Sequence, residues 1–217
     1  MVKIGILGGT FDPPHNGHLL LAEEVRRQLK LDEVIFIPAG EPWIKASQRV
    51  SPAVERLEMV KLAVAGRAFF SVSDMEVRRL GPSYTWETLV ELKKRYPDDE
   101  LYFILGWDIL HSLPLWQEPQ RIIQSACLVS APRVGALQPD IEALDAAVPG
   151  IGCRTIILTQ PRIDVSATAI RKLVELGQPV DHLVPPDVAA YISAMGLYKT
   201  KHTSEHQSSE PSASFGR

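Results

Sequence analysis

Cysteine and long apolar runs are scarce in this sequence, and their scarcity excludes several classes of protein. Cys127 and Cys153 are the only cysteines among 217 residues, and they do not form a CxxC pair. Isolated thiols favour buried cysteines in a reducing compartment over a disulfide framework or a zinc ribbon. No apolar run is long enough to span a bilayer, and the N-terminal run leads directly into a glycine-rich turn. We therefore expect a cytoplasmic protein with no membrane partner.

An excess of positive charge is also missing. The chain has 23 basic and 26 acidic side chains, which gives a formal net charge of −3. Proteins that bind nucleic acid through its phosphates normally present a basic surface, so we expect no nucleic-acid partner. Any anion must then be bound by a local site. With 45% hydrophobic and 23% charged residues, the composition is that of a globular protein with one well-filled domain.

What the chain does contain is a regular alternation of short apolar runs and longer amphipathic stretches. The apolar runs are continuous, which is typical of strands covered on both faces. This alternation predicts an α/β fold with a doubly wound parallel sheet and C-terminal helices. The expected strands are 3–7, 33–38, 68–72, 101–105, 127–131 and 155–159. The expected helices are 17–30, 52–66, 86–96, 119–125, 140–148, 166–177 and 186–195.

The second expected helix has clear start and stop signals: Ser51 as its cap, Pro52 at its first position and Gly66 at its end. We expect a single domain over 1–199. The remaining segment, 200–217, is polar and rich in serine, and we expect it to be a disordered tail. In a doubly wound sheet, ligands bind beyond the carboxyl ends of the strands where the strand order reverses, so the site is expected in the loops that leave the strands.

The most informative loop follows the first expected strand and reads GGTFDPPHNGHL over 8–19. Gly8 and Gly9 allow close approach of the backbone to a ligand and a positive φ. His15 lies just before the next helix and His18 lies in its first turn, where free N–H groups and the helix dipole favour phosphate. Gly17 removes a side chain that would crowd the phosphates. This loop therefore predicts a phosphate site with two imidazole donors.

Three other sites fit this loop poorly. A dinucleotide-binding loop requires GxGxxG, but the sequence here is GILGGT, and the GxxxxGK[ST] pattern of a P-loop is absent. A zinc site at His15 and His18 would need further ligands, and neither HExxH nor a cysteine cluster supplies them. Two ordinary surface histidines remain the simplest structural alternative.

The segment GTFDPPHNGH resembles the (T/S)FDPxHxGH motif of the nucleotidyltransferase superfamily, whose HxGH element is shared with class I aminoacyl-tRNA synthetases. The resemblance implies a Rossmann-like nucleotidyltransferase fold. It also implies that His15 and His18 are catalytic and stabilise the charge that develops at the α-phosphate of ATP. The adjoining residues of the motif would contact ATP: Gly8, Gly9, Thr10 and Phe11.

A second segment, IDVSATAIRKLV over 163–174, opens another expected helix. Ser166 is a suitable N-cap, and Arg171 lies where its guanidinium can reach back to an anion; a capped helix with a solvated arginine is the plain alternative. The segment resembles the ISxTxIR motif of adenylyltransferases, which implies that Ser166, Thr168 and Arg171 bind ATP phosphates. By the same resemblance Lys45 would contact a phosphate, although a solvated lysine is the plain alternative. A synthetase-type KMSKS loop is absent.

Three further segments resemble the nicotinate-mononucleotide adenylyltransferase family. PSYTWETL implies that Thr85 lies near a pyridine ring. GWD implies that Gly106 leaves room for adenosine and that Asp108 accepts a hydrogen bond from a ribose hydroxyl. SLPLWQE implies that Trp116 stacks on the pyridine, although a half-buried packing residue would give the same pattern. Trp107 occupies the variable position of GxD.

The resemblance extends to about Tyr198 and implies adenylyl transfer from ATP to nicotinate mononucleotide in NAD biosynthesis. Mg²⁺ is expected on the ATP phosphates, because the sequence has no carboxylate cluster for a metal and Asp12 is the only nearby candidate. A homo-oligomer is left open. Two alternatives also stay open: another adenylyl or cytidylyl transfer, with an acceptor such as nicotinamide mononucleotide or phosphopantetheine, and a regulatory nucleotide-binding module without catalysis.

Overall fold

The protein folds around a parallel six-stranded sheet. The computed structural model describes residues 1–43, 50–161 and 163–199. Neighbouring strands pair in the order β4-β2-β1-β6-β7-β8, and every pair is parallel. The strands are β1 Lys3–Gly9, β2 Glu33–Pro38, β4 Phe70–Val72, β6 Glu100–Gly106, β7 Cys127–Ala131 and β8 Thr155–Ile157. All six strands coincide with the expected apolar runs, so the predicted sheet is confirmed.

The strand order reverses between β1 and β6. From β1 the chain proceeds outward to β2 and β4, and it then returns to place β6 on the other side of β1. The loops that leave β1 and β6 therefore diverge from neighbouring strand ends, and the space between them is the crevice in which doubly wound sheets bind ligands.

Helices cover both faces of the sheet because its strands are apolar on both sides. In β2, Val34 and Phe36 belong to one buried cluster, whereas Ile35 and Ile37 belong to the other. The first cluster includes α1, α2, α8 and α9, and the second includes α4, α6 and α7. These helices are α1 Asn16–Leu29, α2 Ala53–Val64, α4 Thr85–Arg95, α6 Pro119–Ser125, α7 Ile141–Ala147, α8 Ala167–Glu175 and α9 Pro186–Ala194.

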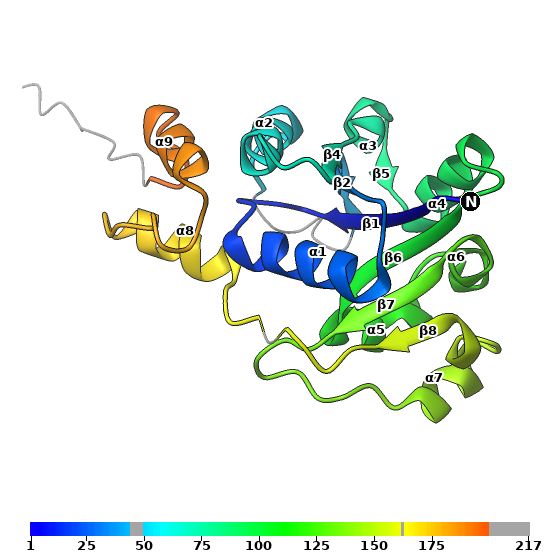
Figure 1. The fold of residues 1–217 in the computed structure, drawn as a ribbon. Helices are drawn as coiled ribbons and strands as arrows, with labels where there is room; N and C mark the ends of the chain where they lie inside the picture. Colours follow the sequence, from blue (N-terminus) through cyan, green and yellow to red (C-terminus); the bar gives the residue numbers. More distant parts are fainter. Residues whose placement is uncertain (44–49, 162, 200–217) are drawn as a thin grey trace, which may run out of the picture.

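The two C-terminal helices lie near the carboxyl end of β1. Figure 1 shows α8 and α9 at the end of the sheet opposite the N-terminus, with α9 beside α2. Asn16, at the start of α1, donates its backbone N–H to the carbonyl of Leu183 at 2.9 Å. The C-terminal part of the chain is thus attached directly to the loop that follows β1.

Several short elements were not expected from the sequence. They are the two-stranded sheet of β3 Glu41–Pro42 and β5 Pro82–Ser83, the helices α3 Met75–Arg78 and α5 Trp107–Ser112, and the 3-10 turns η2 Leu113–Leu115 and η3 Gly152–Arg154. Each is too short to produce a recognisable hydrophobic period.

Two local predictions were wrong. Ser51 does not cap α2: Pro52 holds that position without a side-chain bond, and Ser51 instead donates its N–H to Asp12 Oδ2 at 3.1 Å. The cysteines are free but not buried, since Cys127 is half-buried and Cys153 exposed. Gly66 follows the end of α2 with φ of +73°, a conformation that favours glycine.

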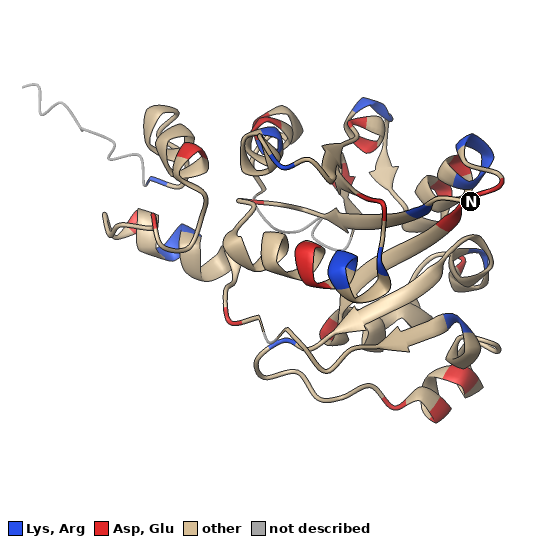
Figure 2. Ribbon diagram, in the orientation of Figure 1, with Lys and Arg blue, Asp and Glu red and all other residues tan. Residues whose placement is uncertain are grey.

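In Figure 2, acidic and basic residues are interspersed along the ribbon. Within the described parts of the chain, no helix combines the length and the apolar character required to cross a bilayer. Lys45 and the tail 200–217 lie outside the described residues, so the tail's disorder stays a prediction.

Candidate active site

The loop from β1 to α1 brings the two motif histidines together. His15 is the extended N-cap residue of α1, and His18 lies in the first turn, as predicted. Their rings stack with centroids 3.6 Å apart. The backbone N–H of His15 donates to His18 Nδ1 at 3.1 Å, so a neutral His18 carries its proton on Nε2. His18 Nδ1 thus acts as the acceptor that fixes the orientation of the ring relative to the start of α1.

His15 is held in its neutral form. Its side chain is buried, and burial together with the nearby Arg133 lowers the pKa of His15 from 6.5 to about 4. Its buried Nδ1 has no hydrogen-bond partner among the described residues. Near pH 7 His15 is therefore an uncharged imidazole, and the fixed positive charge beside it belongs to Arg133.

The glycines of this loop act by leaving space and not by adopting a positive φ. The positive φ of the loop, +50°, falls on Phe11 instead, and neither Gly8 nor Gly9 adopts one, which corrects the prediction. A Cβ on Gly9 would lie 3.2 Å from the Phe11 ring. A Cβ on Gly17 would lie 2.7 Å from Ile163 Cγ2, so Gly17 permits close packing of α1 against the segment before α8.

Two adjoining cavities lie at the strand crevice. The smaller, of about 300 Å³, and the larger, of about 530 Å³, share Asp108, Arg133, Ile163 and Val165 in their walls. The predicted site residues that line the smaller cavity are Gly8, Gly9, Thr10, His15, His18, Thr85, Gly106, Asp108 and Trp116. The larger cavity is lined by Asp108 and, across from it, by Ser166 at the start of α8.

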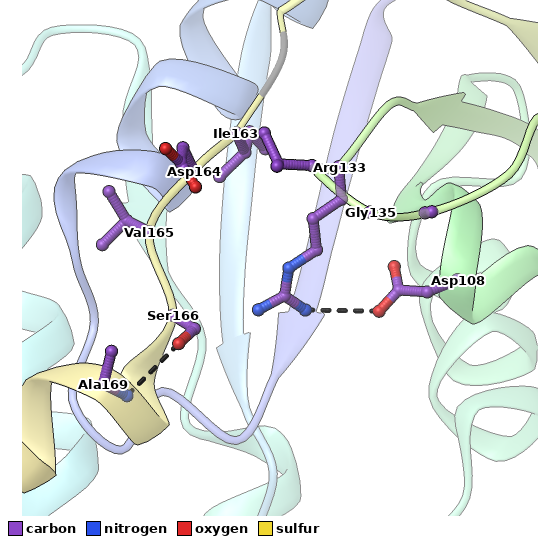
Figure 3. Close-up of a pocket in the computed structure, with 10 residues that line it drawn as sticks. Asp108, Arg133, Gly135, Ile163, Asp164, Val165, Ser166 and Ala169 are labelled. Carbon is purple, nitrogen blue, oxygen red and sulfur yellow. Dashed lines mark hydrogen bonds and ion pairs between the residues drawn. The ribbon is translucent and has the colours of Figure 1, made fainter.

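Arg133 and Asp108 meet where the two cavities adjoin. Arg133 Nη1 lies 3.2 Å from Asp108 Oδ2, and Figure 3 shows the two side chains pointing toward each other with Ser166 beyond the guanidinium. The other carboxylate oxygen, Oδ1, is buried without a partner among the described residues. A Cβ on Gly106 would lie 2.6 Å from that oxygen, so Gly106 makes room for the Asp108 carboxylate itself.

The second motif is built partly as predicted. Ser166 caps α8 by accepting the N–H of Ala169 at 3.2 Å. Arg171 donates to the backbone carbonyl of Asp12 at 2.8 Å. Thr168 is exposed and accepts from Arg171 at 3.4 Å. Thr168, Arg171 and the buried Phe11 line neither cavity, so their contacts with ATP stay predictions.

Aromatic side chains gather at the predicted pyridine site. The half-buried Trp116 ring packs edge-on against Trp43 and Phe103, at centroid distances of 6.5 and 6.4 Å. Its indole N–H donates to Ser112 Oγ at 3.3 Å, which fixes the orientation of the ring. Trp107 is half-buried, and its indole nitrogen has no partner among the described residues. A flat ring can thus enter a cavity whose wall already contains an oriented indole.

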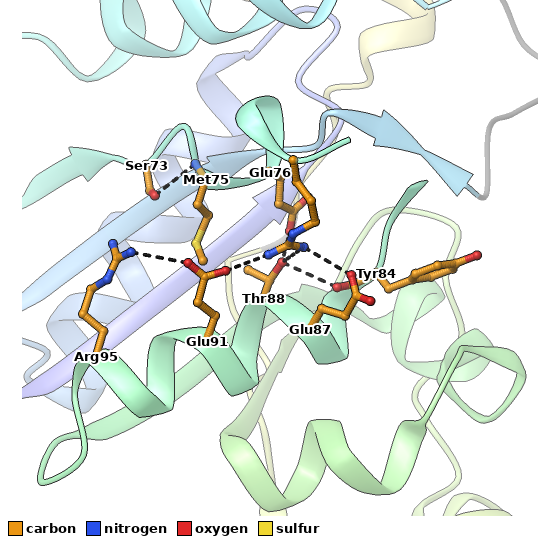
Figure 4. Close-up of polar contacts among 9 residues, drawn as sticks. Ser73, Met75, Glu76, Tyr84, Glu87, Thr88, Glu91 and Arg95 are labelled. Carbon is orange, nitrogen blue, oxygen red and sulfur yellow. Dashed lines mark hydrogen bonds and ion pairs between the residues drawn. The ribbon is translucent and has the colours of Figure 1, made fainter. Parts of the chain in front are cut away.

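A buried polar network fixes the start of α4, where Thr85 lies. Thr88 donates its hydroxyl to Glu76 of α3 at 2.6 Å, and Glu76 also lines the smaller cavity. Burial raises the pKa of the Glu76 carboxyl. Figure 4 shows the network continuing along α4 to Glu91 and Arg95, whose side chains form an ion pair at 3.4 Å.

Comparison with known proteins decides the family. A family model described as cytidylyltransferase-like matches residues 6–173. A relative from Dehalococcoides mccartyi named nicotinate-nucleotide adenylyltransferase is 53% identical over 198 residues, covering 91% of this chain and 97% of the relative. The chain belongs to the nicotinate-nucleotide adenylyltransferase family. A Bacillus licheniformis member is 40% identical over 200 residues, covering 92% of this chain and 100% of the relative.

Solved structures confirm the fold. Plasmodium falciparum nicotinic acid mononucleotide adenylyltransferase complexed with NaAD superimposes with a TM-score of 0.75 at 18% identity, covering 91% of this chain and 98% of that chain. The complex of the same protein with APC gives a TM-score of 0.73 at 18% identity, with the same coverage. The predicted Rossmann-like nucleotidyltransferase fold and the resemblance to this family are therefore both confirmed.

Two arginines of the site were missed by the sequence analysis. Arg133 follows β7 and lines the smaller cavity. Its position directly after a buried strand, near the point where the strand order reverses, is the sequence signal that could have identified it as a site residue. Arg56 is 1% exposed although it lies within an amphipathic helix, and it donates to the carbonyls of Thr10, Gly40 and Ser51 at 2.8, 2.8 and 2.9 Å. No local pattern distinguishes it from a surface arginine.

Asp12 does not have the arrangement of a metal ligand. Its carboxylate is 4% exposed, and its two oxygens accept from the N–H of Ser51 and from the hydroxyl of Tyr198. Within the described residues, no three His, Cys, Asp or Glu side chains are grouped so that they could hold a metal ion. Asp12 therefore connects the loop to Ser51 and to Tyr198.

Proposed function

We propose that this chain transfers the adenylyl group of ATP to nicotinate mononucleotide and releases pyrophosphate. The observation that carries the proposal is the shared cavity: His15 and His18, expected at the phosphates, line the same cavity as Thr85 and Trp116, expected at the pyridine. The groups expected at the phosphates and those expected at the pyridine therefore face the same space, beside the adjoining larger cavity. Membership of the nicotinate-nucleotide adenylyltransferase family supports the same reaction.

The reaction is an in-line displacement at phosphorus. An oxygen of the acceptor 5′-phosphate forms a bond to the α-phosphorus of ATP, and the bond from that phosphorus to the bridging oxygen breaks. The electron pair of the broken bond leaves with pyrophosphate. The attacking oxygen is already anionic, so no side chain needs to remove a proton, and the protein contributes orientation and charge stabilisation.

On the ATP side, the proposed contacts come from side chains that line the smaller cavity. His18 and the neutral His15 ring would contact the phosphates, and Arg133 would provide a full positive charge next to them. At the larger cavity, Ser166 and the first N–H groups of α8 suit the outer phosphates. Phosphate binding would oblige Arg133 to share its guanidinium between the ligand and Asp108.

Mg²⁺ is proposed to arrive with ATP instead of residing in the protein. Both carboxylate oxygens of Asp12 already accept hydrogen bonds, so Asp12 is not available to a metal ion. Asp108 is the described carboxylate that lines both cavities. On the ATP phosphates the ion would offset negative charge during displacement. The side chains of this chain would then contact the phosphates directly.

On the acceptor side, the proposal assigns the pyridine to the space beside Trp116 and the start of α4. Thr85 is the first residue of α4, and the N–H groups of Thr85 and Trp86 have no carbonyl partner within that helix, whereas those of Glu87 and Thr88 donate to the Tyr84 carbonyl. Such N–H groups suit a carboxylate better than an amide, which favours nicotinate over nicotinamide.

The test is pyrophosphate release with ATP, Mg²⁺ and one of three acceptors at equal concentration: nicotinate mononucleotide, nicotinamide mononucleotide or phosphopantetheine. We expect a strong preference for the nicotinate form. Preference for another acceptor would keep the phosphate chemistry but refute the assignments of Thr85 and Trp116. Silence with all three acceptors, together with ATP binding, would replace the proposal with a regulatory nucleotide-binding module.

A variant at His18 tests the phosphate assignment. We expect His18→Ala to lower kcat by roughly 10²–10³-fold, which is the usual effect of removing one donor to a developing negative charge. His182→Ala is the matched control, because the His182 side chain is exposed and only its backbone carbonyl contacts α1, through Asn16. Near-normal turnover of His18→Ala would remove His18 from the mechanism.

A further inference from the structure

A tyrosine near the end of the described C-terminal segment contacts the catalytic loop. Tyr198 lies four residues beyond the end of α9, and its hydroxyl donates to Asp12 Oδ1 at 2.6 Å. The two residues are 186 positions apart in the sequence. Burial and the adjacent carboxylate raise the pKa of the Tyr198 hydroxyl, so it stays protonated and remains a donor.

Asp12 is the point at which the loop is held. Its side chain accepts from Tyr198 and from the Ser51 N–H, while its backbone carbonyl accepts from Arg171 at 2.8 Å. Two prolines separate Asp12 from His15, and every residue from 11 to 15 is buried. A displacement of Asp12 is therefore transmitted through a short, stiff and tightly packed segment to the stacked histidines.

We propose that Tyr198 is a positioning residue for adenylyl transfer, which holds Asp12 and thereby places His15 and His18 at the α-phosphate. The C-terminal segment after α9 then contributes to catalysis even though Tyr198 lines neither cavity. This inference rests on the proposed function, because it concerns the same two histidines.

Geometry argues for positioning and against mere packing. The Asp12 carboxylate is 4% exposed, so without the Tyr198 hydroxyl one oxygen of a buried anion would lose its donor. A buried anion compensates for a lost donor by moving toward water or toward another donor. Both movements would shift the loop that carries the histidines.

The chain supplies a matched control in Tyr191 of α9. Its hydroxyl also donates to a carboxylate, Glu55 of α2, at 2.5 Å. Tyr191 therefore attaches the same C-terminal region to the body of the protein by the same kind of bond. Unlike Asp12, Glu55 has no place in the loop of the histidines.

The experiment compares Tyr198→Phe with Tyr191→Phe in steady-state assays of the full chain with ATP, Mg²⁺ and nicotinate mononucleotide. Displacement of catalytic groups by a fraction of an ångström typically lowers kcat with little effect on ground-state binding, so we expect Tyr198→Phe to lower kcat about tenfold with both KM values within about twofold. Tyr191→Phe should keep kcat within about twofold of wild type. Urea unfolding should show a larger stability loss for Tyr198→Phe than for Tyr191→Phe, because Asp12 is buried and Glu55 is only half-buried, so the split between kcat and KM is the readout that separates positioning from stability.

Asp12→Asn tests the same bond from its other end and covers the case in which Tyr198→Phe folds poorly. If Tyr198 acts through Asp12, the kcat of the double variant should be little lower than that of the single variant with the lower kcat. The inference is overturned if Tyr198→Phe keeps wild-type kcat, if Tyr191→Phe loses as much, or if the two single losses multiply in the double variant. An inactive wild-type chain would instead refute the proposed function, so the two failures are distinguishable.

Discussion

Arg56 gives the sharpest stability prediction, because one buried cation joins three separate segments of backbone. Its guanidinium donates to the carbonyls of Thr10, Gly40 and Ser51. Arg56→Met keeps most of the side-chain volume but removes all three donors and the positive charge near Asp12. The segments that would lose support are the catalytic loop and both described ends of the connection between β2 and α2.

The expected loss follows from the number of groups left unpaired. Breaking a buried charged pair by removing one partner costs about 3–5 kcal/mol, and three carbonyls losing charge-assisted bonds fall in the same range. For a chain of this size, about 4 kcal/mol corresponds to a decrease in Tm of about 8–16 °C. Arg56→Lys should lose less, because it keeps the charge but cannot reach three carbonyls at once.

The assay is urea unfolding at pH 7, with the unfolding free energy and its slope measured for each variant. Arg78→Met is the control, since the Arg78 side chain is 78% exposed and pairs with Asp74 at the surface. The control should change stability by less than about 1 kcal/mol. An unfolding free energy of Arg56→Met that is within about 1 kcal/mol of wild type, or higher, would refute the reasoning. Such a result would place Arg56 among the buried charged groups that apolar side chains replace without loss of stability.

Three further predictions concern the site. Gly17→Ala places a methyl group 2.7 Å from Ile163 Cγ2. We expect activity in the pyrophosphate assay to decrease at least about tenfold, because displacement of catalytic groups lowers the rate. Unchanged activity would show that the Ile163 side chain moves aside without displacing them. Gly106→Ala places a methyl group 2.6 Å from Asp108 Oδ1 and should displace the carboxylate that is expected to bind the ribose of ATP. The variant should therefore raise KM for ATP more than KM for the acceptor. The reverse order would contradict the ribose assignment. His15 binds protons more weakly in the folded state, with its pKa lowered to about 4, so its contribution to stability is lost as pH falls from about 6.5 toward 4. Between pH 7 and pH 5 this loss is about 2 kcal/mol in urea unfolding, and it should be absent in His15→Gln, whereas equal losses in both proteins would contradict the prediction.

The sheet and the main helices were predictable because their signals are local. Continuous apolar runs mark strands covered on both faces, and all six coincide with the strands of the sheet. Side-chain caps were less predictable: Ser166 caps its helix, whereas α2 begins one residue later than expected, with Pro52 as its N-cap and Ser51 outside the helix. A cap can be identified from residue types only when the helix begins at the expected residue.

The candidate site was predictable where a motif names the residue and not where a distant contact defines its role. His15, His18 and Trp116 belong to recognisable segments and line one cavity. Arg56 and Tyr198 act on the loop from 46 and 186 residues away, and only the folded chain shows these contacts.

The most direct test of the central claim follows the fate of labelled ATP. With ATP labelled at the α-phosphate, Mg²⁺ and nicotinate mononucleotide, the account predicts that the label enters a dinucleotide, while a γ-phosphate label is released in pyrophosphate in equal amount. An α-label that remains in ATP, or that appears in AMP without a dinucleotide, would contradict adenylyl transfer to the mononucleotide.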